Sequence, residues 1–298
     1  MHPFLVYNLI KRMKMKLVHT IHELRAELDI QRKAGKKIGL VPTMGALHEG
    51  HASLVRRAVA ENDVCVVSVF VNPTQFNNPE DLLKYPRNLA QDAQLLETIG
   101  AHFVFAPTPE EMYTSEEMNT SFSFDFNGLD EVMEGRMRPG HFNGVVQVVS
   151  RLFDLVHPTR AYFGEKDFQQ LAIIQHMVSR SSMADRFRDI QIIPCPIVRE
   201  ESGLALSSRN ERLSEQEKNI AVAISQTLFS SLEWAKTMSV ADVQQRVIDT
   251  INAIDGLEVE YYEIVDKTTL QPTTTFQNAI GCVTVYCGPV RLIDNIQY

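Results

Sequence analysis

Short apolar runs alternate with amphipathic helical patterns through the first two-thirds of the chain, and this alternation constrains the fold more than any other feature. The clearest run, DVCVVSVFV at residues 63–71, consists almost entirely of β-branched and other apolar residues. Such a run is typical of a strand that is buried on both faces. Strands that alternate with helices need crossover connections, which favour a parallel sheet. The sequence therefore predicts an α/β fold with helices covering a parallel sheet.

The same patterns locate the individual elements. A helical pattern begins soon after Met15, and a capping box at Thr20 with a glycine at position 35 predicts a first helix over residues 20–34. Further helices are predicted over residues 53–62, 87–98, 142–156 and 168–179, and strands over residues 37–42, 63–71, 101–106, 161–163 and 191–193. Parallel sheets of this kind bind ligands at the carboxyl ends of their strands.

The alternation of strand and helix patterns ends after about residue 190. Two long helical patterns, over residues 215–236 and 240–254, precede three β-rich runs over residues 257–265, 279–286 and 290–293. We interpret residues 15–190 as a domain built on the parallel sheet and residues 191–298 as a smaller α+β domain. Residues 1–14 are expected to form a loose N-terminal extension.

Composition excludes several classes of protein. The formal net charge of −8 argues against a general nucleic-acid binder, which needs a basic face. No apolar run approaches the length of a membrane span. The four cysteines stand apart in apolar segments with no Cys-x-x-Cys pair, which indicates a packing role in a reducing compartment. We expect a cytoplasmic protein.

Two His-x-x-His pairs occur, and their surroundings differ. His19 and His22 lie at the predicted start of the first helix, where a solvated position is expected. His48 and His51, in VPTMGALHEGH, follow a buried strand and open the next helix. The spacing does not match the His-Glu-x-x-His pattern of zinc enzymes, and no third ligand is evident. A helix N-terminus with nearby glycines suits an anion, so this stretch alone leaves phosphate binding and structural packing open.

Two further clusters favour the phosphate alternative. Gly164-Glu165-Lys166-Asp167 also follows a predicted strand and opens a helix. Leu206-Ser207-Ser208-Arg209 brings hydroxyls and a guanidinium together between the two domains. The chain lacks the glycine patterns of dinucleotide-binding and P-loop proteins, so those classes lose their main support.

These motifs resemble a known family. The His48-Glu49-Gly50-His51 signature with a later Ser-Ser-Arg loop is similar to the His-x-Gly-His nucleotidyltransferases, which have a Rossmann-like sheet. The segments PTMGALHEGH, VFVNPTQF, YPRN, RPGHFNGV, FGEKDFQQL and LALSSRNERLS resemble the pantothenate synthetases more closely, from about Met15 to the C-terminus.

The resemblance implies an activity. Members of this family condense (R)-pantoate with β-alanine at the expense of ATP, through a pantoyl adenylate, and release pyrophosphate and AMP. The resemblance also implies magnesium as cofactor, a cytoplasmic homodimer, and no nucleic-acid or membrane partner. Two alternatives remain open at this point: another His-x-Gly-His nucleotidyltransferase, and a catalytically silent nucleotide-binding module.

The resemblance further implies site residues. Catalytic roles are expected for His48, His51, Lys166, Ser207, Ser208 and Arg209. The implied ATP contacts are Met44, Gly45, Ala46, Leu47, His48, Glu49, Gly50, His51, Gly164, Glu165, Lys166, Asp167, Val198, Leu206, Ser207, Ser208 and Arg209. Gln75 and Gln170 match the pantoate-binding glutamines and are the expected pantoate- and β-alanine-binding residues. Asp92 and Asn72 match positions near the phosphates, with Asp92 as the magnesium ligand. Pro42, Met44, Phe70 and Val146 are candidates for an apolar wall around the pantoate methyl groups. Arg138 and His141 lie in a matching loop to which no role is assigned.

Overall fold

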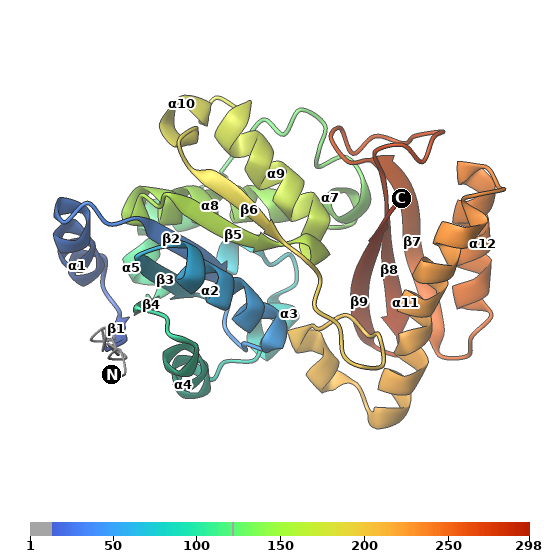
Figure 1. Ribbon diagram of the computed structural model, residues 1–298, viewed down its shortest axis with the longest axis horizontal. Coiled ribbons are helices and arrows are strands. Elements are labelled where there is room, and N and C mark those ends of the chain that lie inside the picture. Colours follow the sequence, from blue (N-terminus) through green and yellow to red (C-terminus); the bar gives the residue numbers. More distant parts are fainter. Residues whose placement is uncertain (1–13, 121) are drawn as a thin grey trace, which may run out of the picture.

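Two sheets organise the chain, and the computed structural model describes them through residues 14–120 and 122–298 (Figure 1). The predicted N-terminal extension, residues 1–14, lies outside the described residues except for Lys14. The first lobe contains β1 (Lys16–Val18), α1 (Ile21–Lys33), β2 (Ile38–Thr43), α2 (Glu49–Glu61), β3 (Val64–Val69), η1 (Pro73–Gln75), α3 (Pro79–Lys84), α4 (Leu89–Ile99), β4 (Phe103–Phe105), α5 (Pro109–Met112), α6 (Ser115–Asn119), α7 (Met133–Met137), α8 (His141–Val156), β5 (Arg160–Gly164), η2 (Glu165–Asp167), α9 (Phe168–Ser179), α10 (Ala184–Phe187) and β6 (Gln191–Cys195). The second lobe contains η3 (Ser208–Arg212), α11 (Glu215–Trp234), α12 (Val240–Asn252), β7 (Leu257–Asp266), β8 (Ala279–Cys287) and β9 (Val290–Gln297).

The sheet of the first lobe is parallel throughout, with the strand order β1-β4-β3-β2-β5-β6. Leu40 at its centre pairs with Val66 of β3 on one side and Ala161 of β5 on the other. The chain adds β3 and β4 to one side of β2, then returns to add β5 and β6 to the other. The order therefore reverses between β2 and β5, where such sheets open a crevice for ligands. The predicted α/β class is confirmed.

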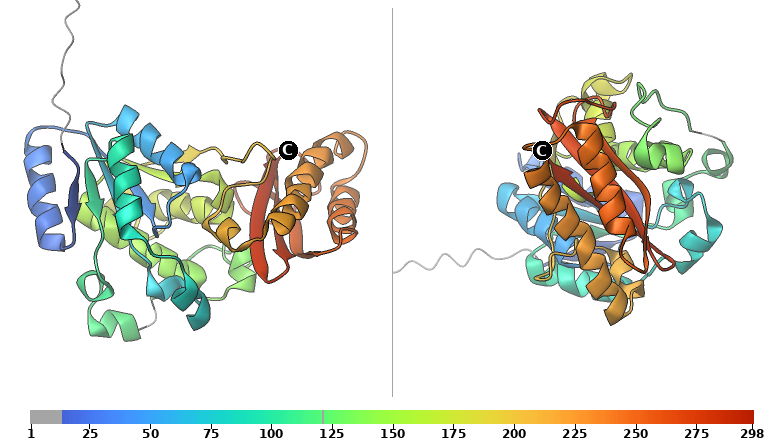
Figure 2. Two further views of the ribbon diagram at one scale, coloured as in Figure 1. Left: turned by 90° about the horizontal axis from the view of Figure 1, so that it is seen from below. Right: turned by 90° about the vertical axis from the view of Figure 1, so that its right-hand side faces the viewer.

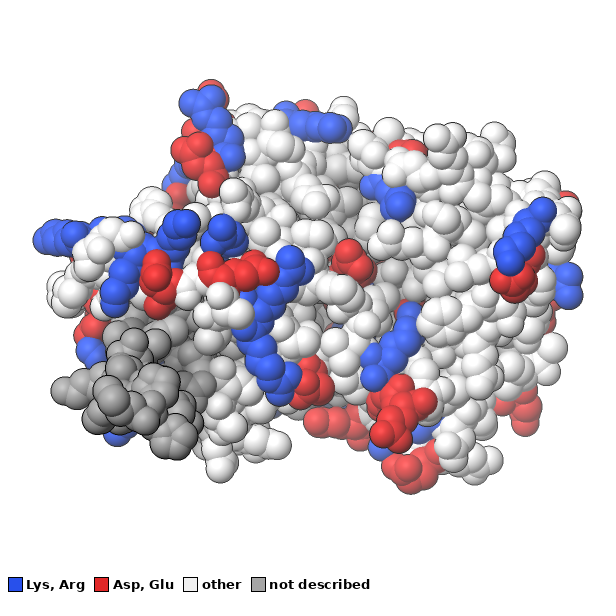
Figure 3. Space-filling model, viewed as in Figure 1, with Lys and Arg blue, Asp and Glu red and all other residues white. Residues whose placement is uncertain are grey.

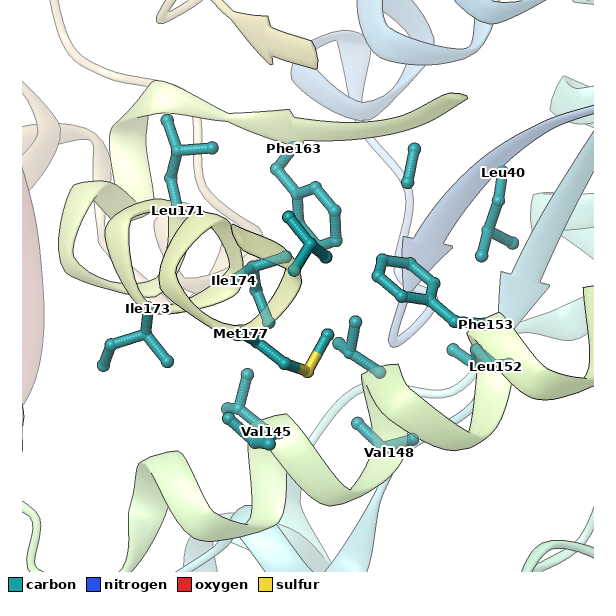
Figure 4. Packing of buried hydrophobic residues seen from close by; sticks show 14 of the residues in the cluster. Leu40, Val145, Val148, Leu152, Phe153, Phe163, Leu171, Ile173, Ile174 and Met177 are labelled. Atoms are coloured by element: carbon teal, nitrogen blue, oxygen red, sulfur yellow. The ribbon is translucent and has the colours of Figure 1, made fainter. Parts of the chain in front are cut away.

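The core of the first lobe lies between the sheet and helices α8 and α9 (Figure 4). Figure 4 labels Leu40 of β2, Phe163 of β5, four residues of α8 (Val145, Val148, Leu152 and Phe153) and four of α9 (Leu171, Ile173, Ile174 and Met177). Phe153, Ile173 and Met177 are completely buried. This packing fixes α8 against the strands whose ends carry the site.

The three-stranded sheet of the second lobe is antiparallel, in the order β7-β8-β9, and is buried on both faces. Alternate residues of a strand point to opposite faces. Tyr261 and Cys282 accordingly pack with the core of the first lobe, whereas Tyr262 and Val283 pack with α11 and α12. Helices α11 and α12 lie on the outer side of this sheet, at one end of the molecule (Figures 1 and 2). The second lobe is therefore joined to the first through a common apolar layer.

Three details differ from the sequence predictions. Residues 16–18, where the helical pattern was expected to begin, form the edge strand β1, which pairs with β4. The helix predicted over residues 53–62 begins at Glu49, because the ring of His48 caps it, and histidine is not a usual capping residue. Strand β6 pairs with β5, so we propose that the division between the lobes lies after Cys195 and not after residue 190.

On the face shown in Figure 3, acidic and basic side chains are interspersed over both lobes. No helix within residues 14–120 and 122–298 is long and apolar enough to cross a membrane. All four cysteines are buried and free.

Candidate active site

A cleft of about 220 Å³ opens at the carboxyl ends of β2, β3 and β5, at the point where the strand order reverses. The second lobe closes one side of this cleft through the segment that leads into η3. Fourteen predicted site residues line it: Met44, Gly50, His48, His51, Gln75, Gly164, Lys166, Asp167, Gln170, Val198, Leu206, Ser207, Ser208 and Arg209. The structure thus brings together residues from both lobes that lie far apart in the chain.

His48 and His51 are held by backbone hydrogen bonds at the N-terminus of α2. The Gly50 N–H donates to Nδ1 of His48 at 3.1 Å, and the His48 N–H donates to Nδ1 of His51 at 3.3 Å. Because both Nδ1 atoms accept, a neutral ring in either position carries its proton on Nε2. A Cβ at position 50 would lie 2.8 Å from the His48 ring, so the capping geometry requires glycine there. The loop therefore presents two Nε2–H donors.

Both imidazoles are neutral at physiological pH. Burial, together with the charge of Lys166, lowers the pKa of His48 to about 4. Burial, followed by the neighbouring His48 and by Lys166, lowers the pKa of His51 to about 3. The two ring centroids are 4.1 Å apart, so a positive charge on one ring would oppose a charge on the other. The positive charge beside these donors comes from Lys166.

Asp92, in the first turn of α4, holds the loop that precedes His48 through hydrogen bonds. Its carboxylate accepts hydrogen bonds from the N–H groups of Ala46 at 3.0 Å and Leu47 at 2.8 Å. Ala46 has a φ of 51°, a left-handed conformation that is unfavourable for a residue with a Cβ. Asp92 is 3% exposed and is not among the residues that line the cleft. Its contacts in the protein are thus with the loop backbone.

Gln75 is held at the floor of the cleft by Asn72. The Asn72 amide donates to Oε1 of Gln75 at 3.1 Å and to the Gly144 carbonyl at 3.0 Å. Tyr113 donates to Oδ1 of Asn72 at 2.9 Å, so the asparagine is fixed from both ends. A Cβ at Gly144 would lie 2.4 Å from the Thr74 carbonyl oxygen, and this glycine therefore lets α8 approach η1 closely.

Lys166 lies in η2, which β9 holds in place. The Asn295 amide, from β9, donates to the carbonyl oxygens of Glu165 at 2.8 Å and Lys166 at 3.0 Å. Asn295 is 4% exposed. The sequence analysis did not identify it, since no local motif connects β9 with a turn so much earlier in the chain. Asn295 belongs to the support of the site.

The Ser-Ser-Arg segment enters the cleft from the second lobe. Oγ of Ser207 accepts the Arg209 N–H at 3.2 Å and caps η3. The Arg209 guanidinium lies 3.5 Å from the Asp81 carboxylate of α3, and this ion pair is about one-third exposed. Such a pair contributes little to stability in water, so the guanidinium is available to a more highly charged partner.

The remaining predicted residues lie around the cleft but do not line it. Gly45, Ala46, Leu47, Glu49, Glu165 and Asp92 belong to this group. Glu49, for example, pairs with Arg56 on the surface of α2. Of the predicted apolar wall, Pro42, Met44 and Phe70 line the cleft but Val146 does not. Val145, Val148 and Val149 of α8 line the cleft instead, because Val146 points to another face of that helix.

No cluster of three or more histidine, cysteine, aspartate or glutamate side chains able to hold a metal occurs within the described ranges 14–120 and 122–298. The arrangement offers donors instead. Two neutral imidazoles, a lysine, two serines and an arginine surround the cleft from both lobes. Such a set stabilises the negative charge of a polyphosphate.

The parallel sheet places the histidine loop and its cleft at the switch point, which is where α/β proteins of this class bind their ligands. The sequence model of the family described as pantoate-beta-alanine ligase matches residues 16–297. The chain belongs to the pantoate–β-alanine ligase family, and the predicted family is confirmed. Membership makes the chain a ligase that forms an amide C–N bond between pantoate and β-alanine.

Relatives of known name support this assignment along nearly the whole chain. The pantothenate synthetase of Phocaeicola vulgatus is 62% identical over 287 residues, which are 95% of this chain and 99% of that protein. The pantothenate synthetase of Porphyromonas gingivalis W83 is 50% identical over the same shares of the two chains.

Solved structures agree in fold. The crystal structure of pantothenate synthetase from Thermus thermophilus has a TM-score of 0.87 at 42% identity, covering 95% of this chain and 99% of that one. The pantoate–β-alanine ligase of Francisella tularensis, complexed with β,γ-ATP and β-alanine, has a TM-score of 0.77 at 34% identity and covers 95% and 97% of the two chains.

Proposed function

We propose that this chain joins pantoate to β-alanine in two steps, through a pantoyl adenylate that forms in the cleft. The observation that carries the proposal is the pair of Nε2–H donors of His48 and His51, which lie in one cleft with Gln75 and Gln170. Hydrogen-bond donors for phosphate and amide groups for hydroxyls, together in one cleft, suit the transfer of a nucleotidyl group to a small hydroxy acid.

In the first step, an oxygen of the pantoate carboxylate attacks the α-phosphorus of ATP. A new P–O bond forms, the bond to the β-phosphate oxygen breaks, and pyrophosphate leaves with the bonding electrons. The donors of His48 and His51 then meet the growing charge, and Lys166 and Arg209 neutralise it. A donor aimed at transition-state charge typically contributes about 3–4 kcal/mol.

The pantoate position follows from the amides and the apolar wall. Gln75 and Gln170 both line the cleft, and an amide can donate to and accept from hydroxyl groups. An amide also avoids the close ion pair with which an arginine would restrain the attacking carboxylate. Phe70, Val145 and Val149 give the methyl groups of pantoate an apolar wall. We therefore propose that pantoate binds beneath the α-phosphate.

In the second step, the β-alanine amine, entering in its neutral form, attacks the carbonyl carbon of the adenylate. The C–N bond forms, the C–O bond to the phosphate breaks, and AMP leaves with the bonding electrons. The nitrogen releases one proton to solvent, so the step is balanced. Neither step requires a covalent bond to the protein.

Magnesium is proposed to enter with ATP. Mg²⁺ bound to nucleotides takes most ligands from phosphate oxygens and water, with one or two carboxylates, and it would neutralise charge on the triphosphate. Asp167 lines the cleft and suits this role. Asp92 was predicted as the magnesium ligand, but its buried carboxylate already accepts two loop N–H groups. We therefore assign Mg²⁺ to Asp167 and give Asp92 the task of ordering the loop.

The resemblance to the family also supports a cytoplasmic homodimer. The four buried thiols agree with a reducing compartment. Light scattering during gel filtration tests the oligomeric state, and a monomeric mass at micromolar concentration would contradict the dimer.

Pantoate-dependent exchange of labelled pyrophosphate into ATP tests the function. The proposed first step predicts exchange with pantoate and none without it. Another His-x-Gly-His nucleotidyltransferase would exchange only with its own substrate, and a silent nucleotide-binding module would not exchange at all. Either of those results would contradict the proposal.

A further inference from the structure

A short hairpin leads from β6 into η3 and carries part of the cleft wall. It spans residues 198–206, and we call it the linker hairpin. The Leu206 N–H donates to the Val198 carbonyl at 3.0 Å, which brings the two ends of the linker hairpin together. Val198 and Leu206 both line the cleft. Because the Ser-Ser-Arg segment follows directly, the position of the linker hairpin also sets the position of the Ser207 and Arg209 side chains.

Arg199, which follows Val198, binds Asp294 of β9 through both arms of its guanidinium. Nη1 donates to Oδ2 at 2.6 Å, and Nη2 donates to Oδ1 at 2.9 Å. The side chain of Arg199 is 17% exposed and that of Asp294 is 4% exposed. The Cζ atom of the same guanidinium lies 5.1 Å from the ring centroid of Phe229 in α11. A bidentate pair this far from water restrains the direction of both side chains, so it fastens the linker hairpin to β9.

Asp294 is also joined to the residue that supports Lys166. Asn295 follows Asp294 in β9, and its N–H donates to Oδ1 of Asp294 at 2.8 Å. The Asn295 amide in turn donates to the carbonyl oxygens of Glu165 and Lys166. Because successive residues of a strand point to opposite faces, two neighbours in β9 can hold two separate turns. An unbroken series of hydrogen bonds thus runs from the linker hairpin through Asp294 and Asn295 to the Lys166 turn.

Neither of the two attached segments is buried deeply enough to hold itself in place. The residues of η2 are at least partly exposed, and Gly164 at its start offers no side-chain cap. Most residues of the linker hairpin are likewise partly or fully exposed. Lys166 and Arg209 approach the cleft on these segments, from different lobes. A triphosphate that binds both cations needs them at a fixed separation, and their common attachment to β9 provides it.

We propose that Asp294 is a positioning residue for the transfer of the adenylyl group. Because it binds Arg199 and the Asn295 N–H at once, it keeps the linker hairpin and the Lys166 turn at the separation that ATP requires. Asp294 is not among the residues that line the cleft, so it acts through these partners and not on the nucleotide. This role rests on the proposed function, and it assigns a part in the first step to a residue of β9.

Asp294→Asn tests this role, since it keeps the shape of the side chain and removes its charge. We expect the KM for ATP in pantoate-dependent pyrophosphate exchange to rise about 10-fold, because the loss of a charge-assisted hydrogen bond loosens one side of the cleft. The KM for pantoate should stay within about twofold of the wild-type value, because Asn72 holds Gln75 within the first lobe. A purely structural role would lower kcat through the loss of folded protein and leave both KM values unchanged.

Two further variants separate positioning from stability. Arg199→Lys keeps a positive charge beside Asp294 but cannot form the bidentate pair. It should fold, and its KM for ATP should be about threefold above that of the wild type, because one hydrogen bond of the pair remains. Val243→Ala is the control, because Val243 is completely buried in α12 and its truncation destabilises the second lobe while the Arg199–Asp294 pair stays intact. This control should lower the Tm and leave the KM for ATP unchanged.

A double variant tests whether Asp294 and Asn295 act as one unit. Asn295→Ala alone should raise the KM for ATP, because it frees the Lys166 turn. If the nucleotide needs both attachments at once, the KM of the double variant with Asp294→Asn should lie within about threefold of the larger single effect. Multiplication of the two effects would mean that the two turns are held independently, and it would overturn the coupling.

An unchanged KM for ATP in Asp294→Asn would overturn the inference, and so would an equal rise in the KM for pantoate. If Asp294→Asn fails to fold, a wild-type KM for ATP in Arg199→Lys is the result that overturns it. Absence of pantoate-dependent exchange in the wild type would instead overturn the proposed function itself. Normal exchange in the wild type leaves that function standing, whatever the KM of Asp294→Asn.

Discussion

Replacing His51 with alanine tests the proposed phosphate chemistry most directly. The neutral ring presents its Nε2–H to the cleft, because Nδ1 is occupied by the His48 N–H. If that donor acts mainly on the charge of the leaving pyrophosphate, its loss costs about 3–4 kcal/mol in the transition state. We therefore expect the first half-reaction to slow by about 10²- to 10³-fold.

The same substitution should cost little stability. His51 contributes one 3.3 Å hydrogen bond to the first turn of α2, and the capping contact of His48 remains. The loss of such a bond costs about 1 kcal/mol, which lowers the Tm of a chain of this size by a few degrees. Catalytic loss should thus be far larger than any change in folding.

The assay compares two reactions of the same variant. Pyrophosphate exchange should fall by the stated factor, while product formation from preformed pantoyl adenylate and β-alanine should stay near the wild-type rate. His22→Ala is the control, because His22 belongs to the other His-x-x-His pair and is exposed on α1. Exchange at a near wild-type rate would refute the donor role, and loss of bound zinc on substitution would point to a metal ligand.

Three further outcomes are expected. Gln75→Ala should raise the KM for pantoate by the equivalent of about 1–3 kcal/mol and leave the Kd for ATP nearly unchanged in calorimetry; equal losses for both ligands would be contrary to the assignment. Asn295→Ala should raise the KM for ATP in steady-state assays, because it frees the turn that carries Lys166; an unchanged KM would mean that the turn holds itself. Burial alone would raise the pKa of Glu134, but hydrogen bonds from Arg291 lower it to about 2. This carboxylate therefore stabilises the fold above pH 4.5. As the pH falls from 4.5 to 2, its protonation should lower the free energy of unfolding of the wild type by about 2–3 kcal/mol, and urea titrations of Glu134→Gln should lack this loss. If the unfolding free energy of Glu134→Gln fell with pH as steeply as that of the wild type, this linkage would be excluded.

Local chemistry made much of this structure predictable. The run at residues 63–71 became the central strand β3, and the capping box at Thr20 became the N-terminus of α1. Both signals reside in a few adjacent residues, and tertiary packing reinforces them. The short helices α3, α5, α6 and α7 were not predicted, because four to six residues are too few to display a helical period.

Contacts between residues far apart in the chain could not be predicted from the sequence. Asp92 meets the loop at Ala46, and Asn295 meets Lys166, only because the fold brings their strands and helices together. Neither pair has a spacing or a composition that marks it. The same applies to Val146, whose neighbours Val145 and Val149 line the cleft, because the sequence does not fix which face of a buried, apolar helix meets the ligand.

The long separation between Asn295 and the turn it supports has a consequence for biosynthesis. The turn that carries Lys166 is complete only when β9 has added to the sheet, and Asn295 follows Lys166 by 129 residues. A nascent chain that has not yet released β9 from the ribosome can fold the parallel sheet but lacks this support. A premature stop codon before Asn295 would therefore weaken a site whose lining residues are all encoded earlier.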